Sequence, residues 1–542
     1  MANPADREVP VLIVGGSLVG LSAAMLLGSH GIPALAVEHH RGTAIHPRAA
    51  QISQRTMEIF RTVGIEQIVR RKSGEQFVQD GAIVAVETLA GKEIAQYISN
   101  LNQGIREVSP SERVFISQSL LEPLLKKKAE DFGAELRFGT DMLSFEQDES
   151  GVTAVVRERD REETATIRAR YMIAADGAHS RIREQLGIRM AGHGVFSHSA
   201  TIYFRANVAP LLRGRNLSVI YVLNPVLRGF FRFEKPFDSG FLAINATGDP
   251  ADPNTDVSAG LTAERCLELI YAALGTRDVP VKIESVMHWD AEANAAERLQ
   301  QGRVFLAGDA AHAMPPNGGF GGNTGVQDAH NLAWKLALAL TGVAGPEILA
   351  TYDAERRPVG IFTMEQAYSR YVTRTAPYLG AKGMQPVEKD LDVEMGYRYS
   401  SAAVAPDGGG GSGGRPGARA PHVPVESDGA VVSTLDLLGK GFTVLAASEG
   451  KVWEEAARRA SQELKANVEH RRIMNPHFAE AYGISAAGAA LVRPDGFIAW
   501  RSVASGGDPV RDLTRALAQV LCREPASVEA SSTSRCQGSV KS

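Results

Sequence analysis

The sequence predicts a multidomain α/β protein, and three stretches of the chain carry that prediction. Near the start, an apolar run, a helical segment and a second apolar run follow one another over residues 9–38, as in a strand–helix–strand unit of a parallel sheet. Residues 201–246 alternate apolar and polar positions, which is typical of an antiparallel sheet with one covered face. A second compact α/β pattern follows a glycine-rich stretch between residues 405 and 419. With 542 residues and 44% hydrophobic content, the chain has ample material for several cores.

The first strand–helix–strand unit carries a glycine-rich turn, GGSLVG, at residues 15–20. In a dinucleotide-binding turn, Gly15 permits the tight bend and Gly20 lets the helix pack closely, while helix amides face phosphate groups. Ser17 stands where the middle glycine is usual, and it adds only a small side chain. Glu38 ends the second strand, where an acidic residue accepts hydrogen bonds from ribose hydroxyls. The expected elements are two strands and a helix, residues 9–14, 34–38 and 18–28.

Two further strands end at an aspartate beside a glycine. The strand in residues 170–175 runs into Asp176-Gly177, and the strand at residues 303–307 runs into Gly308-Asp309. After the second of these, glycines lead into a long helical pattern that reaches residue 340. This arrangement offers an aspartate for a sugar hydroxyl and helix-terminal amides for an anionic or electron-rich group.

The three motifs in this order resemble those of the class A FAD-dependent aromatic hydroxylases, which share the p-hydroxybenzoate hydroxylase fold, over residues 8–375. The resemblance implies that the first turn holds the ADP part of FAD and that Asp176-Gly177 serves both FAD and NAD(P)H. It further implies that Asp309 contacts the ribityl chain and that residues 319–323 lie beside the isoalloxazine ring. The cofactor-binding residues it assigns are Gly15, Gly16, Ser17, Leu18, Val19, Gly20, Glu38, Arg48, Gln118, Asp176, Gly177, Asp309, Gly321, Gly322 and Asn323.

Two departures from the family pattern stand out. Ser17 replaces a glycine, a change that we expect the site to tolerate. The family's common GGQGMNTG form appears here as GGFGGNTG, so Phe320 lies within the flavin segment and bears on flavin mobility or on the substrate pocket.

The region after the glycine-rich stretch resembles the thioredoxin-like domain of phenol hydroxylases and polyketide hydroxylases. GARAPHVPV at residues 417–425 and AALVRPDGFIAWR at residues 489–501 carry the likeness. The region has no CxxC pair, so a structural or oligomerisation role is favoured over disulfide exchange. The three cysteines, Cys266, Cys522 and Cys536, are far apart, which disfavours a disulfide framework or a zinc site and indicates a reducing compartment.

The predicted fold is therefore a Rossmann-like FAD-binding domain, an antiparallel β-sheet substrate domain and a C-terminal thioredoxin-like α/β domain. The predicted boundaries are 1–180 for the FAD-binding domain, with some inserted segments of the substrate side, 181–285 for the substrate domain, 286–400 for the returning FAD-binding domain, 401–418 for the linker, 419–525 for the thioredoxin-like domain and 526–542 for a disordered tail.

The resemblance implies an FAD- and NAD(P)H-dependent monooxygenase, with NADPH favoured. Through a flavin C4a-hydroperoxide it would insert one atom of O2 into an aromatic or heteroaromatic ring, phenolic and polyketide-like, in secondary metabolite (antibiotic) biosynthesis. A Baeyer–Villiger or decarboxylating activity on the same scaffold and a non-oxygenating FAD reductase or binding protein remain alternatives. The sequence identifies no catalytic base. Candidate pocket residues are Tyr203, Arg205, Tyr221, Phe231 and Pro315.

Charge and composition disfavour other classes of partner. The formal net charge is −4 and no long Lys/Arg run occurs, so nucleic acid is not an expected partner. The first residues contain acids and prolines rather than a signal peptide, and no apolar run reaches about 18 residues. We therefore expect a cytoplasmic protein with no membrane and no metal site, and a homodimer or higher oligomer is compatible with the sequence.

Overall fold

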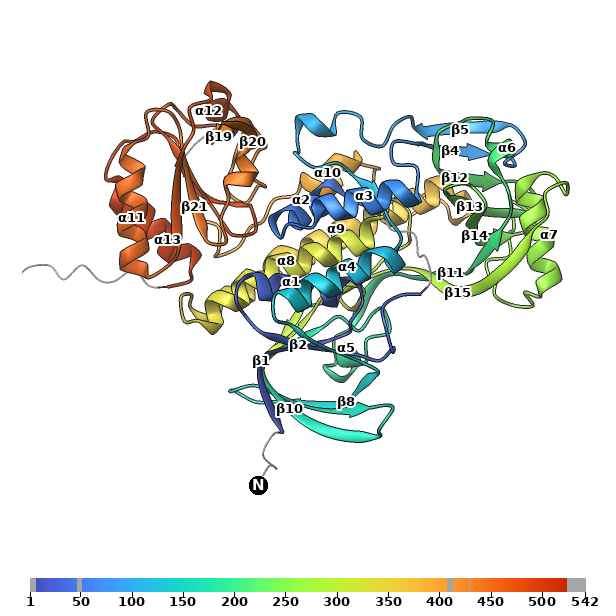
Figure 1. Ribbon diagram of the computed structural model, residues 1–542, viewed down its shortest axis with the longest axis horizontal. Coiled ribbons are helices and arrows are strands. Elements are labelled where there is room, and N and C mark those ends of the chain that lie inside the picture. The colour runs from blue at the N-terminus through green and yellow to red at the C-terminus, as the bar shows by residue number, and fades with distance from the viewer. Residues whose placement is uncertain (1–5, 46–50, 407–412, 428, 524–542) are drawn as a thin grey trace, which may run out of the picture.

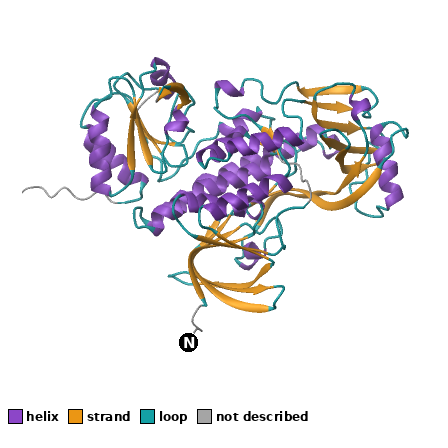
Figure 2. Ribbon diagram, viewed as in Figure 1, coloured by secondary structure: helices purple, strands orange, loops and turns teal. Residues whose placement is uncertain are grey.

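The computed structural model describes residues 6–45, 51–406, 413–427 and 429–523 (Figure 1). Arg48, most of the glycine run and the predicted tail at 526–542 lie outside the described residues. Three bodies are visible: a layer of strands under a bundle of helices, a second sheet at one end, and a separate α/β unit at the other (Figures 1 and 2).

The first sheet contains the dinucleotide-binding turn. β1 (Arg7–Val14) lies between β10 (Glu163–Ala174) and β2 (Ala34–Glu38), and it pairs with both in parallel. β10 also pairs in parallel with β17 (Val304–Leu306), so all three motif-bearing strands end at one edge. The remaining strands are β7 (Glu135–Phe138), β8 (Thr140–Gln147), β9 (Val152–Glu158) and β16 (Gln300–Gln301).

Helices cover this edge of the sheet. α1 (Leu18–Ser29) follows β1, and it packs against α4 (Gln118–Asp131) and α8 (Phe320–Leu340). α9 (Ala350–Arg374) lies beside α8 and reaches toward the second sheet (Figure 1). Smaller elements complete this domain: β3 (Gln51–Ile52), α2 (Gln54–Thr62), α3 (Glu66–Gln76), β6 (Val114–Phe115), α5 (Arg181–Gln185) and α10 (Asp390–Met395).

The second sheet has eight strands in the order β18-β15-β11-β14-β13-β12-β4-β5. Its antiparallel centre confirms the prediction for the middle of the chain. α7 (Ala263–Leu274) packs on one face, and the other face turns toward α9 and the start of α8. The elements are β4 (Ala82–Val86), β5 (Glu93–Ile98), β11 (Met190–Arg205), α6 (Ala209–Leu212), β12 (Leu217–Leu223), β13 (Leu227–Glu234), β14 (Ser239–Thr247), β15 (Lys282–Ala296) and β18 (His312–Ala313). Three of its strands, β4, β5 and β18, thus come from outside residues 181–285, and β15 runs past that boundary to Ala296.

The C-terminal domain has a four-stranded sheet, β22-β21-β23-β24, flanked by helices. The described ends of the predicted linker are packed: the Ala405 N–H donates to the Ala499 carbonyl oxygen at 2.8 Å, and the Pro416 carbonyl oxygen accepts from Arg398 at 3.0 Å. The elements are β19 (Pro424–Ser427), β20 (Ala430–Ser433), β21 (Phe442–Ala446), α11 (Val452–Leu464), β22 (Val468–Arg472), α12 (Pro476–Tyr482), β23 (Ala489–Val492), β24 (Ile498–Ser502) and α13 (Pro509–Val520).

Candidate flavin-binding site

The turn after β1 is built so tightly that its glycines have no room for a side chain. Gly15 has φ +106°, and a Cβ there would overlap the carbonyl oxygen of Ala175, which precedes Asp176. A Cβ on Gly20 would overlap the carbonyl oxygen of Gly15. A Cβ on Gly16 would stand 2.6 Å from Cβ of Glu38. The turn therefore brings its backbone against both neighbouring strand ends, which is the close approach that a pyrophosphate site needs.

Ser17 caps α1 by its position but directs its hydroxyl to another helix. Its Oγ donates to Glu122 Oε1 at 2.5 Å and accepts from Gln118 Nε2 at 2.9 Å. Both partners lie on α4, and Gln118 is the first residue of that helix. Ser17 thus joins α1 to α4, and the hydroxyl makes no side-chain cap with the amides of α1. Leu18 and Val19, the next residues, pack toward Gly322 and Gly308.

Glu38 stands at the end of β2 with both carboxylate oxygens turned to backbone amides. Oε2 accepts from the Gly16 N–H at 2.5 Å, and Oε1 accepts from the His40 N–H at 2.8 Å. The carboxylate therefore lies directly beside the glycine turn, at the strand end where the sequence predicts a ribose contact.

Asp176 holds a buried carboxylate with unused hydrogen-bonding capacity. Oδ2 accepts weakly from the Ile182 N–H at 3.4 Å, and Oδ1 is buried with no hydrogen-bond partner in the described part of the chain. Burial raises the pKa of this carboxyl above its ordinary value. Gly177 follows with φ +86°, a left-handed conformation that only glycine adopts without strain. Buried acceptors in proteins normally have a donor, so a buried acceptor without one at a predicted nucleotide site indicates that a ligand group, such as a hydroxyl, donates to it.

The third motif meets the first because α8 packs very closely on α1. Gly308 has φ +63°, and a Cβ on Gly325 would stand 2.5 Å from Val19 Cγ2 and 3.0 Å from Gly308 Cα. Asp309 is exposed, and its Oδ1 lies 4.0 Å from the point where a Cβ on Gly321 would stand. Asp309, Gly321 and the start of α1 therefore share one small region.

Asn323 braces the first turn of α8. Its Nδ2 donates to the carbonyl oxygens of Gln51 at 2.6 Å and Gly319 at 2.7 Å, and its Oδ1 accepts from the Ser53 N–H at 2.8 Å. All of these partners are backbone groups, so the side chain ties α8 to the start of α2 and leaves its backbone amide as the group for a ligand.

The residues present fit FAD. The first amides of a helix lack an intrahelical partner, and in α1 and α8 no N-cap side chain satisfies them, so they remain available to a ligand in the shared region. Two positive helix ends, an orphaned carboxylate at Asp176 and a glycine turn with no room for side chains suit the phosphates, hydroxyls and ring edge of a dinucleotide.

The side of the second sheet that packs against α9, where we expect the flavin, is aromatic. Tyr203 packs there with Phe241, Phe230 and Trp289, and Tyr221 lies on the same side beside Tyr97. Phe231 points the other way, into the core under α7, and so is not on this face; its neighbour Phe230 is. Arg205 is exposed and paired with Glu284 at 2.6 Å. Pro315 is buried in the loop before α8, two residues before Asn317, whose Nδ2 donates to the Tyr221 hydroxyl at 3.3 Å.

Arg228 Nε, Tyr371 Oη and Tyr378 Oη are buried beside this face with no hydrogen-bond partner among the described residues, and Arg232 Nη2, further along β13, is another such atom. We call the first three side chains the donor cluster. Arg228 lies on β13, and the two tyrosines, which no sequence motif marks, come from α9 and the turn after it. Burial raises the pKa of both tyrosines, so both stay protonated and able to donate.

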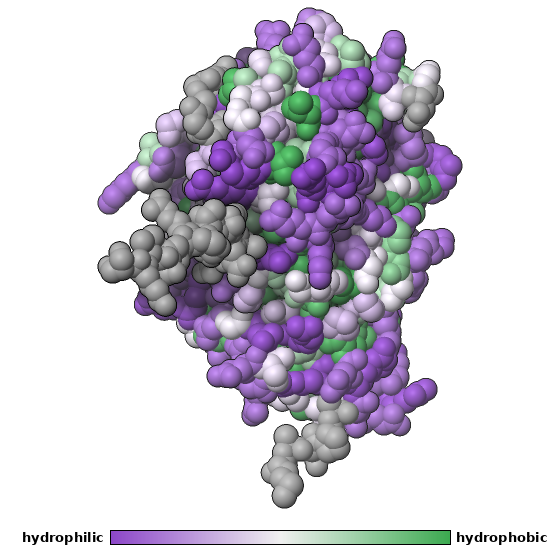
Figure 3. Space-filling model, turned by 90° about the vertical axis from the view of Figure 1, so that its left-hand side faces the viewer, coloured by the Kyte–Doolittle hydropathy of each residue, from purple (hydrophilic) through white to green (hydrophobic). Residues whose placement is uncertain are grey.

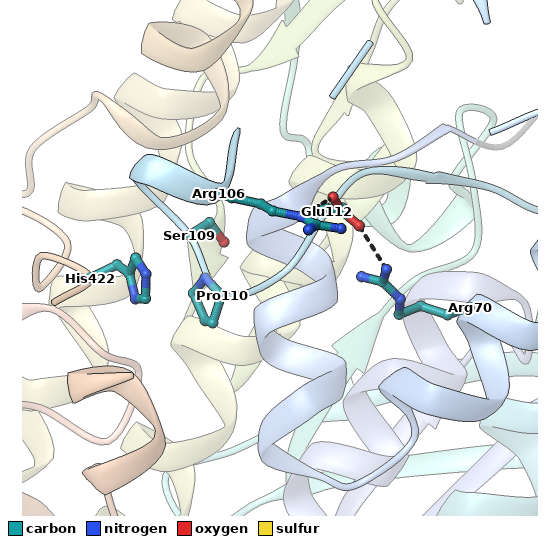
Figure 4. Close-up of a pocket in the computed structure, with 6 residues that line it drawn as sticks. All are labelled: Arg70, Arg106, Ser109, Pro110, Glu112 and His422. Atoms are coloured by element: carbon teal, nitrogen blue, oxygen red, sulfur yellow. Dashed lines mark hydrogen bonds and ion pairs between the residues drawn. The ribbon is translucent and has the colours of Figure 1, made fainter. Parts of the chain in front are cut away.

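An open cleft of about 290 Å³ lies elsewhere, between the loop at residues 105–113 and the C-terminal domain (Figure 4). Glu112 in this cleft pairs with Arg70 and Arg106, each at 2.6 Å, and His422 lines the opposite side. It contains none of the motif residues, so this cleft is separate from the candidate cofactor site.

The fold and the site define a flavoprotein with a separate substrate sheet, and comparison with known proteins gives its family. A model of the FAD binding domain matches residues 8–367, and a model of the aromatic-ring hydroxylase C-terminal region matches residues 413–523. The chain belongs to this family of FAD-binding aromatic-ring hydroxylases.

Individual relatives agree. A 4-methyl-5-nitrocatechol 5-monooxygenase from a Burkholderia species is 52% identical, with 96% of this chain and 99% of that protein covered. The tetracenomycin A2 monooxygenase-dioxygenase of Streptomyces glaucescens is 38% identical, with 95% and 97% covered. A crystal structure of aklavinone-11 hydroxylase with FAD and aklavinone matches with a TM-score of 0.89 at 35% identity, over 96% of this chain and 100% of that one.

These findings confirm the predicted family, fold class and enzyme class: the chain is an FAD-dependent monooxygenase of aromatic compounds. They disfavour the alternative of a non-oxygenating FAD protein. Within the described part of the chain, no helix is both long and apolar enough to cross a bilayer, and no cluster of metal-ligating side chains occurs.

Proposed function

We propose that the chain oxidises NAD(P)H, with NADPH the favoured donor, and inserts one atom of O2 into an ionised phenol or catechol. The ring binds against the aromatic, flavin-facing side of the second sheet. Bound FAD supplies the chemistry of hydride acceptance and oxygen activation, while the chain binds, orients and desolvates the ring.

The donor cluster is the observation that carries this proposal. A buried donor without an acceptor costs about 1–3 kcal/mol, and Arg228 Nε is such a donor. The Tyr371 and Tyr378 hydroxyls lie near each other, and neither has a partner at hydrogen-bond geometry among the described residues, so both can turn to a ligand. A ligand with anionic or acceptor oxygens removes that cost. Arg228 makes no ion pair among the described residues, so its charge favours the ionised form of a phenol.

Tyr221 is placed to orient the ring. Its hydroxyl accepts from Asn317 Nδ2 at 3.3 Å, and Asn317 also donates to Thr375 Oγ1 at 3.2 Å. The Tyr221 proton is thereby left for an oxygen of the substrate. Because Asn317 precedes the first turn of α8, this contact joins the substrate sheet to the flavin segment. Ionisation of the phenol makes the ring more nucleophilic, which is what oxygen transfer to carbon requires.

The two substrate classes suggested by the relatives differ in acidity. A nitro-substituted catechol ionises more readily than an unsubstituted phenol, which suits a face that favours anions, and the relative named for such a compound is 52% identical. A polyketide-like phenol, which the sequence resemblance implies, is supported by the match to aklavinone-11 hydroxylase. We favour the acidic catechol, because the donor cluster provides three donors for its oxygens.

The test is a substrate panel with purified, FAD-loaded protein. NADPH oxidation is measured with 4-methyl-5-nitrocatechol, catechol, phenol and aklavinone, and products are analysed by mass spectrometry under ¹⁸O2. We expect the nitrocatechol to accelerate NADPH oxidation most and to yield a product carrying one ¹⁸O. Because the named position of oxygenation carries the nitro group, nitrite should be released with it.

Turnover of aklavinone without turnover of any catechol would replace the proposed substrate by the polyketide class. A flavin that NADPH does not reduce in the presence of any of these ligands would refute the proposed co-substrate. A direct comparison with NADH decides between the two nicotinamides.

A further inference from the structure

The C-terminal domain meets the FAD-binding domain through buried ion pairs. Arg493 lies in the turn between β23 and β24, and its Nη1 donates to Glu355 Oε1 on α9 at 2.6 Å, across 138 residues of sequence. Its Nη2 donates to Asp495 Oδ2, in the same turn, at 2.5 Å. All three side chains are almost completely buried.

α8 completes this group. Lys335 Nζ donates to Glu355 Oε2 at 2.7 Å and to Asn331 Oδ1 at 2.8 Å. Asn331 Nδ2 in turn donates to Glu355 Oε2 at 2.7 Å and contacts Asp495 Oδ2 at 3.3 Å. We call Lys335, Glu355, Arg493 and Asp495 the interdomain ion cluster. The cluster holds two positive and two negative charges and is therefore electrically neutral. Loss of either Arg493 or Asp495 would leave a buried charge without its opposite.

The same helix faces lead from the interdomain ion cluster to the flavin segment. Arg356 follows Glu355 on α9, and its Nε donates to Asp328 Oδ1 on α8 at 2.8 Å. Asp328 Oδ2 accepts from the Gly308 N–H at 3.1 Å, directly before Asp309, and contacts His312 Nε2 at 2.7 Å. Asp328 lies one helical turn before Asn331, so movement of α8 at the cluster also moves the group that holds the Gly308-Asp309 turn.

A second set of contacts connects Arg356 on α9 to the turn that contains Arg493. Arg356 Nη1 donates to the Tyr399 hydroxyl at 3.1 Å, and the Tyr399 ring packs on Phe497 with centroids 4.2 Å apart. Phe497 ends the turn that contains Arg493.

The visible outer face of the molecule at the end where the C-terminal domain lies is largely hydrophilic, with hydrophobic residues scattered among polar ones (Figure 3). The turn with Arg493 and Asp495 is buried and faces α8 and α9, where it contacts Asn331 and Glu355.

We propose that the C-terminal domain is a positioning element of the flavin site. Arg493 and Asp495 hold α8 and α9 in register, and Asp328 transmits that register to the Gly308-Asp309 turn and the first turn of α8. The domain thereby acts on FAD through the helices, with no contact of its own to the cofactor.

The test compares two interdomain arginines in the FAD-loaded full chain. Arg493→Lys keeps the charge but cannot bind Glu355 and Asp495 together. We expect its dissociation constant for FAD to rise about tenfold, its flavin absorption spectrum to change, and amide hydrogen exchange to increase over residues 306–312. The matched control is Arg61→Lys, because Arg61 also binds the C-terminal domain, at Asp436 Oδ1 (2.5 Å), but lies at the far end of α2. It should bind FAD within about twofold of the parent chain.

An Arg493→Lys protein that melts earlier but matches Arg61→Lys in FAD affinity, spectrum and hydrogen exchange would overturn the proposal. If Arg493→Lys does not fold, Tyr399→Phe takes its place, because it removes only the hydroxyl that Arg356 contacts. We expect Tyr399→Phe to bind FAD about threefold more weakly than the parent chain. Unchanged FAD affinity and unchanged hydrogen exchange in this variant would also overturn the proposal.

Discussion

At the scale of single residues, Glu38 shows how a sequence motif becomes a ligand contact. Its carboxylate accepts from the Gly16 and His40 amides, so it is already held beside the glycine turn. Glu38→Ala should weaken FAD binding by about 1–3 kcal/mol, the usual worth of hydrogen bonds to a charged group. Flavin fluorescence on titration with FAD measures the effect, and Glu8→Ala, an exposed acid on β1, is the control. Equal affinities in the two variants would remove Glu38 from the site.

Asp309 is predicted to contact the ribityl chain, and its substitution tests a second part of the FAD site. It is exposed in the turn beside Gly321, where the resemblance places the ribityl chain. Asp309→Ala should purify with a reduced flavin content, because a hydrogen-bond acceptor for the ribityl hydroxyls is lost; Asp309→Asn should lose less. The ratio of absorbance at 450 nm to protein concentration reports occupancy. Full occupancy in Asp309→Ala would contradict the assignment.

Arg228 tests the proposed preference for an ionised substrate. A nearby positive charge lowers the pKa of a bound phenol by about 1–3 units, and 4-nitrocatechol reports its ionisation by its visible absorption. Arg228→Gln should lose most of that shift, whereas Arg228→Lys should keep part of it. Arg205→Gln is the control, because Arg205 is exposed and paired with Glu284. A bound ligand whose pKa is the same in Arg228→Gln as in the parent chain would exclude Arg228 from the substrate site.

At the scale of elements, the approach of α8 to α1 depends on a glycine. A Cβ at Gly325 would stand 2.5 Å from Val19 Cγ2, so Gly325→Ala should push the two helices apart, lower the melting temperature and weaken FAD binding together. Gly74→Ala on α3 is the matched control, since nothing lies within 4 Å of its Cβ position. It should stabilise the protein by about 0.5–1 kcal/mol through helix propensity. A Gly325→Ala chain that behaves like Gly74→Ala would refute this packing argument.

The sequence predicts elements well where one local pattern suffices. The β1–α1–β2 unit and the strand ends at Asp176 and Asp309 lie where the pattern places them, because period and turn chemistry are local. The faces of β13 could not be predicted. Phe230 and Phe231 are both aromatic, and only the packing of α7 shows that Phe231 faces the core. The pairing of β4 with β12 could not be predicted either, because the two strands are more than a hundred residues apart in the sequence.

At the scale of the whole molecule, the sequence does not predict the contacts between the C-terminal domain and the FAD-binding domain. Lys335 and Glu355 have the residue types of solvated helix faces, and Arg493 and Asp495 have those of a turn. Their burial is compensated by opposite charges: Glu355 pairs with Lys335 and Arg493 from other segments, and Asp495 pairs with Arg493 in its own turn. The thioredoxin-like pattern and the lack of CxxC indicated a structural domain, but not that its charged turn would face the flavin domain.

The same interface makes the stability of the protein depend on pH through His330. This histidine on α8 is buried, and burial, with Arg55 nearby, lowers its pKa from 6.5 to about 3. The folded state therefore holds His330 neutral at pH values where the unfolded chain binds a proton. Because the unfolded state binds more protons between pH 6.5 and about 3, stability falls as pH falls through that window.

Between pH 7.5 and pH 5, this one group should cost the native state about 2 kcal/mol, at 1.36 kcal/mol for each unit below the unfolded pKa. His330→Gln should remove that part of the pH dependence, while His288→Gln, at an exposed position on β15, should keep it. Urea titrations of the three FAD-loaded proteins at both pH values measure the difference. If His330→Gln loses as much stability as the parent chain between pH 7.5 and pH 5, the histidine is protonated in the native state and its neighbours must stabilise the charge.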